Sequence, residues 1–209
     1  MIARFVKRAI DVAAGGVGLA ALSPALLLIG AAIRLDSPGP ALFRQDRVGK
    51  DGRVFRLVKF RTMRAGAPVE FRADGSTRVA ESDARLTKIG KLLRGGIDEL
   101  PQLLNVLRGE MSLVGPRPDM PVHAATYTEA ERGKLAVKPG MTSLAAVLGR
   151  NQLFWRTRIA IDLRYIEYWS LGLDLAIIAQ TMALPFRRQL FRFDELVEGI
   201  DLLRSGDAT

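Results

Sequence analysis

The 209-residue chain contains no cysteine and a single histidine, His123. The absence of cysteine excludes disulfides, thiolate nucleophiles, zinc ribbons and iron–sulfur clusters. One histidine excludes sites built from several histidines and argues against a Ser-His-Asp hydrolase. His123 is better explained as an exposed or capping residue than as a catalyst. Any chemistry must therefore use carboxylates, Lys, Arg, Ser or Thr, alone or with a hard metal ion.

The sequence also lacks a Walker-type phosphate loop and the G-x-S-x-G motif of many hydrolases. Residues 16–21 fit a loose dinucleotide-binding fingerprint, but they lie within an apolar run with no strand before it, so we reject that interpretation. Acidic residues are in the minority, since 31 Lys and Arg stand against 22 Asp and Glu, a formal net charge of +9. We therefore expect anionic partners: phosphates, nucleic acid or an acidic membrane leaflet.

Charged residues are absent from Val12 to Ile33, a run of 22 residues that is long enough to cross a bilayer as one helix. A signal peptide is disfavoured because the run is long and no small-residue cleavage site follows it. Lys and Arg flank the run on both sides, so the positive-inside rule places both flanks in the cytoplasm. A single span cannot satisfy that arrangement.

Ser23 and Pro24 stand near the middle of the apolar run. Proline removes a backbone donor and kinks a helix, and the serine hydroxyl can bond to a carbonyl one turn earlier and reduce that cost. Each half of the run is about 17 Å long, against a hydrocarbon core of about 30 Å. We therefore expect a re-entrant helix–break–helix, although the residues alone leave a single span open.

The rest of the sequence predicts an α+β domain that is mostly helical. Residues 41–48 and 54–60 read as strands around the turn Lys50–Arg53, which predicts a small β-hairpin. Residues 63–83 are polar and predict a surface loop. Apolar residues at helical spacing predict further helices, over residues 83–94, 98–107, 126–136, 156–169 and 172–184.

Two segments near the end of the chain have the composition of interfacial helices. Tyr165, Tyr168 and Trp169 form an aromatic set suited to the boundary between bilayer and water. Residues 186–193 mix cations with aromatic side chains, as an amphipathic helix lying on a membrane does. Both segments are therefore expected to face lipid.

Asp98 and Glu99 form an adjacent acidic pair that follows a cationic helix and begins the next one. The pair has a structural explanation, because Asp is a favoured N-cap and Glu in the first turn complements the helix dipole. The functional explanation is that a carboxylate here meets concentrated positive charge, where it can hold Mg²⁺ or attack phosphorus. Spacing alone leaves both explanations open. The cations expected nearby, which suit phosphate oxygens, are Lys59, Arg61, Lys91, Arg94 and Arg117.

Several blocks, in order along the chain, carry a resemblance to a known family. They are Lys7-Arg8-x-x-Asp11, Ser23-Pro24, Phe43–Gly49, Lys59–Met63, Asp98–Pro118, Lys138–Thr142, Gly149–Asn151, and Asp162-x-x-Tyr165 through Asp174. Over roughly residues 4–182 the chain resembles the monotopic phosphoglycosyl transferases, bacterial sugar transferases that start glycan assembly on a lipid.

The resemblance implies a reaction that composition could not indicate. A sugar 1-phosphate would move from a UDP-sugar to polyprenyl (undecaprenyl) phosphate, with release of UMP. Asp98 would be the nucleophile that forms a covalent phosphosugar intermediate, with Glu99 beside it as a metal or acid–base partner and Mg²⁺ at the site. The residues that would hold the phosphates and the nucleotide are Lys59, Arg61, Arg94, Arg117 and Arg150.

The resemblance also implies an arrangement at the membrane. Residues 1–35 would form a re-entrant helix broken at Ser23-Pro24, residues 36–203 a cytoplasmic catalytic domain with interfacial helices, and residues 204–209 a tail. The site would then lie at the cytoplasmic leaflet of the bacterial inner membrane. Without the extra membrane helices of the long family members, the chain is expected to be a small form of the family, with no nucleic-acid partner.

One segment departs from the family's usual Pro-Gly-x-Thr-Gly-x-x-Gln pattern. Ser143 follows Thr142, and Ala146 stands where the glutamine would be, so an amide that could help seat the donor is missing. A family member with altered donor choice or lost activity is one alternative. A membrane-tethered basic binding module without catalysis is another, because it explains the net charge equally well. The sequence specifies neither the sugar, nor the glycan pathway, nor whether the protein forms a homodimer.

Overall fold

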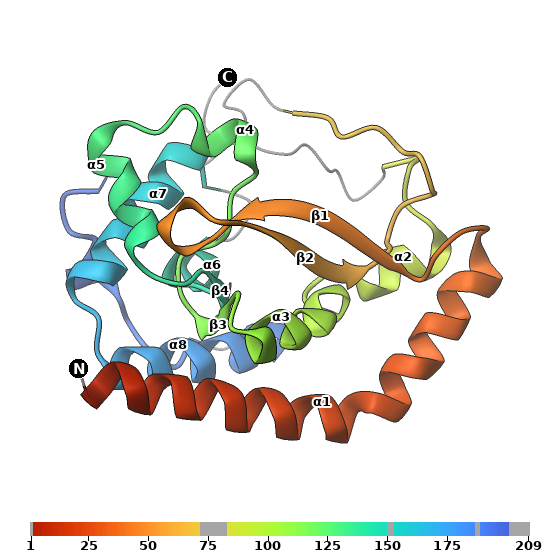
Figure 1. The fold of residues 1–209 in the computed structure, drawn as a ribbon, viewed down its shortest axis with the longest axis horizontal. Coiled ribbons are helices and arrows are strands. Elements are labelled where there is room, and N and C mark those ends of the chain that lie inside the picture. The colour runs from red at the N-terminus through yellow and green to blue at the C-terminus, as the bar shows by residue number, and fades with distance from the viewer. Residues whose placement is uncertain (1, 72–82, 150–152, 187–188, 201–209) are drawn as a thin grey trace.

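The computed structural model describes residues 2–71, 83–149, 153–186 and 189–200. A β-hairpin lies across the middle of the molecule, with helices around it and one long N-terminal helix along an edge (Figure 1). The helices are α1 (Ile2–Asp36), α2 (Lys88–Leu93), α3 (Leu103–Arg108), α4 (Pro121–Ala124), α5 (Glu129–Arg132), α6 (Leu144–Leu148), α7 (Trp155–Glu167) and α8 (Leu171–Ala183). The described residues thus form the mostly helical α+β fold that the sequence predicts.

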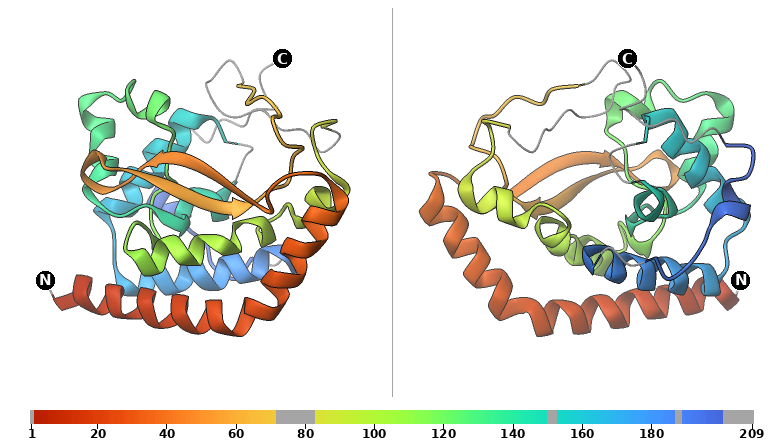
Figure 2. Two further views of the ribbon diagram at one scale, coloured as in Figure 1. Left: turned by 45° about the vertical axis from the view of Figure 1, so that its right-hand side comes forward. Right: turned by 180° about the vertical axis from the view of Figure 1, so that it is seen from behind.

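Helix α1 is continuous over 35 residues and contains Pro24 in its interior. The hydroxyl of Ser23 donates a hydrogen bond to the carbonyl of Ala20 at 2.8 Å, which confirms the predicted bond to the preceding turn. Two limbs of the helix meet at a sharp bend (Figures 1 and 2), as expected where proline removes a backbone donor. The interruption predicted from the sequence is therefore a bend within one helix, and the first limb extends back to Ile2.

Most of the apolar surface of α1 is not covered by the rest of the protein. Among the described residues, α1 is the one helix long and apolar enough to cross a bilayer, and 6% of its most apolar window is buried. Val17, Leu27, Leu28 and Leu35 are each more than two-thirds exposed. A contiguous apolar surface of this kind marks a membrane or partner contact.

Polar contacts fix the first limb of α1 to the domain, alongside α3 and α8 (Figure 2). The ammonium of Lys7 forms an ion pair with Asp174 of α8 at 2.5 Å. Arg8 donates to two carbonyls at the end of α3. Asp11 is 3% exposed and accepts hydrogen bonds from two residues of strand β3 (Ser112–Val114). The charges ahead of the apolar run therefore also hold the helix in place.

The predicted hairpin is confirmed. Strands β1 (Leu42–Val48) and β2 (Val54–Phe60) pair antiparallel around the short 3-10 helix η1 (Lys50–Gly52). Asp51 and Gly52 have positive φ angles of 57° and 75°, the conformation that a tight connection between right-handed twisted strands requires. In this register Phe43 lies opposite Lys59, which places that lysine near the α1 end of the hairpin.

A second pair of strands was not predicted from the sequence. Strands β3 (Ser112–Val114) and β4 (Gly140–Thr142) pair in parallel, and three residues are too few to show alternation. The chains approach so closely that a Cβ on Gly140 would lie 2.1 Å from the backbone nitrogen of Gly115. Glycine is therefore required where β4 crosses the loop that follows β3.

Several predicted helices are shorter than the apolar spacing indicated. Helix α2 begins after Thr87, whose side chain accepts from the backbone N–H of Gly90, so residues 83–87 are not helical. The prediction for 98–107 corresponds to the 3-10 helix η2 (Ile97–Gln102) followed by α3. The prediction for 126–136 corresponds to α5 and the 3-10 helix η3 (Gly133–Ala136). Local hydrogen bonds, rather than apolar periodicity, set these boundaries.

The helix predicted over residues 186–193 is wrong in its described part. The 3-10 helix η5 ends at Phe186, and residues 189–193 are not helical. The side-chain carbonyl of Gln180 accepts from the backbone N–H groups of Leu190 and Phe191. Because a side chain satisfies these donors, the segment follows the surface of α8 without forming its own helix.

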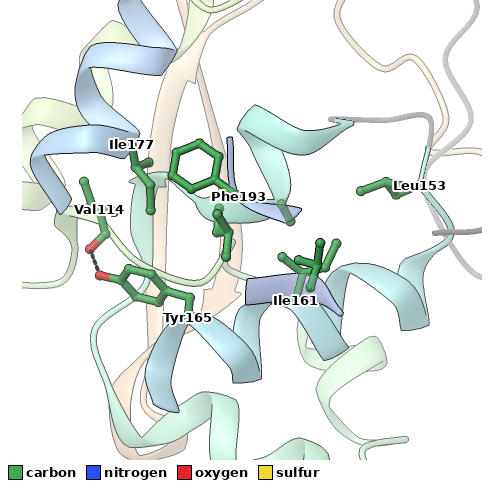
Figure 3. Close-up of a cluster of buried hydrophobic side chains, with 9 residues drawn as sticks. Val114, Leu153, Ile161, Tyr165, Ile177 and Phe193 are labelled. Atoms are coloured by element: carbon green, nitrogen blue, oxygen red, sulfur yellow. Dashed lines mark hydrogen bonds between the residues drawn. The ribbon is translucent and has the colours of Figure 1, made fainter. Parts of the chain in front are cut away.

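The main core lies between α6, α7, α8 and β3 (Figure 3). Ile161 and Tyr165 of α7 meet Val114 of β3 and Ile177 of α8. Tyr165 is 2% exposed, and its hydroxyl donates to Asp174 at 2.7 Å. The prediction that Tyr165 faces the membrane interface is therefore wrong, because a core position with a polar partner satisfies both ends of its ring.

Candidate active site

Asp98 and Glu99 lie in η2, directly after a reversal of the chain. Gly95 and Gly96 have positive φ angles of 119° and 129°, which residues with a side chain rarely adopt. Gly96, not Asp98, occupies the N-cap position of η2, and no side chain caps it. The structural explanation of Asp98 as an N-cap is therefore wrong, and its carboxylate is not used to begin the helix.

Glu99 forms an ion pair with Arg117 from the loop that follows β3, at 2.9 Å. Burial acts to raise the pKa of Glu99, but the charge and hydrogen bond of Arg117 outweigh it and hold this pKa below its usual value. The charge of Glu99 in turn raises the pKa of Arg117. The Gly-Pro-Arg-Pro loop and the acidic pair, predicted to meet, are thus in direct contact.

Asp98 is in a different electrostatic state from its neighbour. Burial and the negative charge of Glu99 raise the pKa of Asp98, while Lys59 and Arg117 oppose that rise. Lys59 lies on the nearby strand β2, and its own pKa is lowered by burial although Asp98 and Glu99 counteract this. Its ammonium lies 5.5 Å from the ring centroid of Phe43. Asp98 is therefore a partly desolvated carboxylate with nearby cations.

Arg47 is a member of this cluster that the sequence analysis missed. Its guanidinium donates to the carbonyl of Pro118 at 2.9 Å and to the side chain of Gln45 at 2.7 Å. Burial, together with the positive charge of Arg117, lowers the pKa of Arg47 to about 10. Strand alternation was the available signal, because residues 43, 45 and 47 share one face of β1.

Arg61 is placed differently from the prediction. It is 4% exposed, and its guanidinium donates to the carbonyls of Ser37 and Pro38 at 2.7 Å and of Ile33 at 3.4 Å. These carbonyls belong to the last turn of α1 and the residues just beyond it. The structure therefore assigns Arg61 to holding the end of α1 against the hairpin, because both terminal nitrogens of its guanidinium donate there.

Arg94 and Arg150 are the two remaining predicted phosphate ligands. Arg94 follows α2 as its C-cap residue and interacts electrostatically with Asp83. Arg150 lies outside the residues that the structure describes. The cations whose charge acts on the acidic pair include Lys59, Arg117 and Arg47.

The departure at residues 143–146 has a local structural reason. Ser143 is the N-cap of α6, and its hydroxyl accepts from the backbone N–H of Ala146 at 3.0 Å. Ser143 is 2% exposed, so this hydrogen bond replaces water that the start of the helix could not reach. Serine is a favoured N-cap, and here it begins a helix that forms part of the main core.

The acidic pair fits a magnesium ion that is shared with a phosphate substrate. Among the described residues no group of three or more His, Asp or Glu side chains comes together, so a site made by protein ligands alone is absent there. Mg²⁺ commonly binds through one or two carboxylates together with substrate phosphates and water. The repulsion by which Glu99 raises the pKa of Asp98 is also what a bound cation would relieve.

Comparison of the sequence with known proteins places this chain in a family. The sequence profile described as bacterial sugar transferase matches residues 2–188. A UDP-glucose:undecaprenyl-phosphate glucose-1-phosphate transferase of Caulobacter vibrioides is 44% identical over 84% of this chain and 68% of its own. The exopolysaccharide production protein ExoY of Rhizobium meliloti is 38% identical over 87% of this chain and 85% of its own.

A longer relative shows the same similarity over part of its length. A UDP-glucose:undecaprenyl-phosphate glucose-1-phosphate transferase of Escherichia coli is 38% identical over 86% of this chain, which corresponds to 40% of the relative. The profile match extends from α1 through α8, and it therefore includes both the acidic pair and the loop that carries Arg117. The chain belongs to the bacterial sugar transferase family.

Proposed function

We propose that this transferase moves a sugar 1-phosphate from a UDP-sugar to polyprenyl phosphate, with release of UMP. The observation that carries the proposal is the ion pair of Glu99 with Arg117 beside Asp98, on which the charges of Lys59 and Arg117 act, in a chain whose relatives are named for this reaction on undecaprenyl phosphate. A module that only binds anions does not need a partly desolvated carboxylate such as Asp98, whose pKa is raised, next to Glu99, which is already paired with Arg117. The site thus favours catalysis over binding alone.

In the first step, the carboxylate of Asp98 attacks the phosphorus that carries the sugar. The bond from that phosphorus to the oxygen of UMP breaks, its electron pair leaves with UMP, and a covalent phosphosugar–Asp98 intermediate forms. Desolvation of Asp98 removes water that would compete with this attack. Lys59, Arg117 and Arg47 supply the positive charge that the donor's phosphates require.

In the second step, an oxygen of the lipid phosphate attacks the same phosphorus and Asp98 leaves as a carboxylate. The product is a diphosphate that joins the sugar to the polyprenol, and the enzyme returns to its starting state. Asp98 and Glu99 would hold Mg²⁺ together with the donor, and the ion would supply charge neutralisation for the diphosphate. The ion pair with Arg117 keeps Glu99 ionised and oriented for this task.

We also propose that α1 enters and leaves the membrane by the cytoplasmic leaflet of the inner membrane. The bend in α1, its exposed apolar side chains and the attachment of both of its limbs to the domain support this placement. The first limb is held through Lys7 and the end of the second through Arg61. A helix held to one domain at both ends cannot place those ends on opposite sides of a bilayer.

The proposed reaction is tested by measuring UMP release from the full chain in nanodiscs that contain polyprenyl phosphate. We expect release in the presence of Mg²⁺ with one member of a panel of UDP-sugars, loss of release when EDTA removes the metal, and recovery when Mg²⁺ is restored. Folded, membrane-bound protein that releases no UMP from any donor would contradict the proposed reaction. Release that EDTA leaves unchanged would contradict the metal requirement alone.

The pH dependence of the rate provides a second prediction. Asp98 must be ionised to attack, so the rate falls as pH decreases through its raised pKa. Lys59 lowers this pKa and Glu99 raises it. Lys59→Met is therefore expected to move the acid limb of the pH–rate profile to higher pH, and Glu99→Gln to lower pH. Single-turnover rates between pH 4 and 9 measure both shifts, and shifts in the same direction would contradict the assignment of the limb to Asp98.

A further inference from the structure

A buried cluster of charged side chains lies behind the loop that carries Arg117. Lys134 of η3 is 5% exposed, and its ammonium lies 2.6 Å from a carboxylate oxygen of Asp119 and 3.0 Å from one of Asp162. Asp162, on α7, is fully buried. Burying three ions carries a high desolvation cost, and apolar residues of similar volume often give equal stability. The arrangement therefore calls for an explanation other than stability.

Asp119 joins this cluster to the loop, because it stands two residues after Arg117. One of its carboxylate oxygens accepts from the hydroxyl of Tyr127 at 2.5 Å, and the other accepts from the indole N–H of Trp155 at 3.2 Å. Its backbone carbonyl accepts from the N–H of Val48 in β1 at 2.9 Å. Asp119 is thus held by side chains from three separate segments and by the backbone of β1.

The loop is held at one further point, where Arg47 donates to the carbonyl of Pro118 at 2.9 Å. Burial raises the pKa of Asp162 to about 6, and the charge of Lys134 opposes that rise. In the part of the chain that the structure describes, the carboxylate oxygens of Asp162 make no hydrogen bond of ordinary geometry. The ion pair with Lys134 is therefore the main compensation for this buried charge.

We propose that Asp119, Lys134 and Asp162, together with Tyr127, position the loop so that Arg117 reaches Glu99 and the phosphates of the donor. The side chain of Arg117 is 42% exposed, so its ion pair with Glu99 depends on where the backbone of the loop lies. The cluster holds this backbone through Asp119, two residues along the loop. This inference rests on the proposed function, because that function gives Arg117 its role at the phosphates.

A double-mutant cycle tests whether the cluster acts through Arg117. Tyr127→Phe removes one hydrogen bond to Asp119 and keeps the aromatic ring. We expect it to lower kcat/KM for the UDP-sugar by about fivefold to tenfold, the ordinary effect of losing one hydrogen bond. When Arg117 is already Ala, the same change is expected to cause no further loss. Tyr168→Phe, at a half-exposed tyrosine, is the matched control and should leave kcat/KM unchanged.

Two results would overturn the proposal. An equal loss from Tyr127→Phe in both backgrounds would show a structural role that is independent of Arg117, and no loss in the native background would show no role. Lys134→Met is expected to give a larger loss with the same dependence on Arg117. If that variant does not fold, Tyr127→Phe carries the test.

Hydrogen exchange separates this proposal from the proposed function. In Tyr127→Phe, we expect the backbone amides of Arg117 and Asp119 to exchange at least about tenfold faster than in the native chain, whether or not the chain is active. Unchanged exchange at both amides would overturn the positioning role. Faster exchange in a chain that releases no UMP would leave the cluster confirmed as a loop support and the proposed reaction refuted.

Discussion

Asp98→Asn is expected to reduce UMP release by a factor on the order of 10⁴ or more, the scale of loss when a covalent nucleophile is removed. An amide nitrogen or oxygen is neutral and cannot form the acyl phosphate that the proposed first step requires. The fold should be preserved, because Asp98 does not cap η2. UMP release by Asp98→Asn and by the native chain, under equal donor and Mg²⁺ concentrations, measures the effect.

Asp46→Asn provides the matched control, because Asp46 is an exposed carboxylate on β1 whose ion pair with Arg56 spans 3.7 Å. It should retain native turnover. Acid quenching of the native chain with a donor labelled in the sugar should leave label on the protein, and Asp98→Asn should leave none. Near-native release by Asp98→Asn would contradict the nucleophile assignment, and label retained by that variant would place the covalent bond elsewhere.

Arg61→Met is expected to destabilise the protein by about 2 kcal/mol or more, because each partly buried carbonyl left without a donor costs about 1–3 kcal/mol. The carbonyls of Ser37 and Pro38 lose their donor, whereas that of Ile33 still accepts from the backbone N–H of Ser37. For a domain of this size, such a loss lowers the unfolding midpoint by about 4 to 8 °C. Thermal unfolding in nanodiscs, followed by near-ultraviolet circular dichroism, measures the shift.

The same substitution distinguishes the two roles considered for Arg61. A phosphate ligand at the site would give a stable variant with a raised KM for the UDP-sugar. A residue that holds α1 to the hairpin would give a less stable variant whose folded fraction keeps its KM. Arg53→Met, which removes an exposed arginine at the hairpin turn, should change neither quantity. An unchanged unfolding midpoint in Arg61→Met would therefore contradict the structural role.

The sequence alone predicted those features that depend on neighbouring residues. The hairpin follows from alternation on both sides of Lys50–Arg53, and its strands end within one residue of the prediction. The bend in α1 follows from Pro24, and the bond of the Ser23 hydroxyl follows from one turn of helix. The meeting of Glu99 with Arg117 was predicted from motifs. In each case the prediction rests on local backbone geometry or on a sequence motif.

Other features depend on contacts between residues far apart in the chain. Tyr165 and Asp174 become core residues because α7 and α8 pack together and give each a polar partner. Residues 189–193 stay non-helical because a side chain of α8 satisfies their backbone donors. Neither of these contacts can be predicted from neighbouring residues in the sequence. Apolar spacing could therefore predict the extent of α7 and α8 but not the side of the protein that their polar and aromatic residues face.

The candidate site also combines features predicted from the sequence with features that depend on the fold. The sequence by itself predicted which carboxylates and which loop form the candidate site, because their residue types stand in fixed blocks, and it also placed Lys59 and Arg117 among the cations expected nearby. Only the tertiary structure decided the places of Arg47 and Arg61. It brought Lys59 and Arg47 to the acidic pair by the pairing of β1 with β2, and it turned Arg61 toward the end of α1. A guanidinium on a long side chain can reach partners in many directions, and only packing selects one of them.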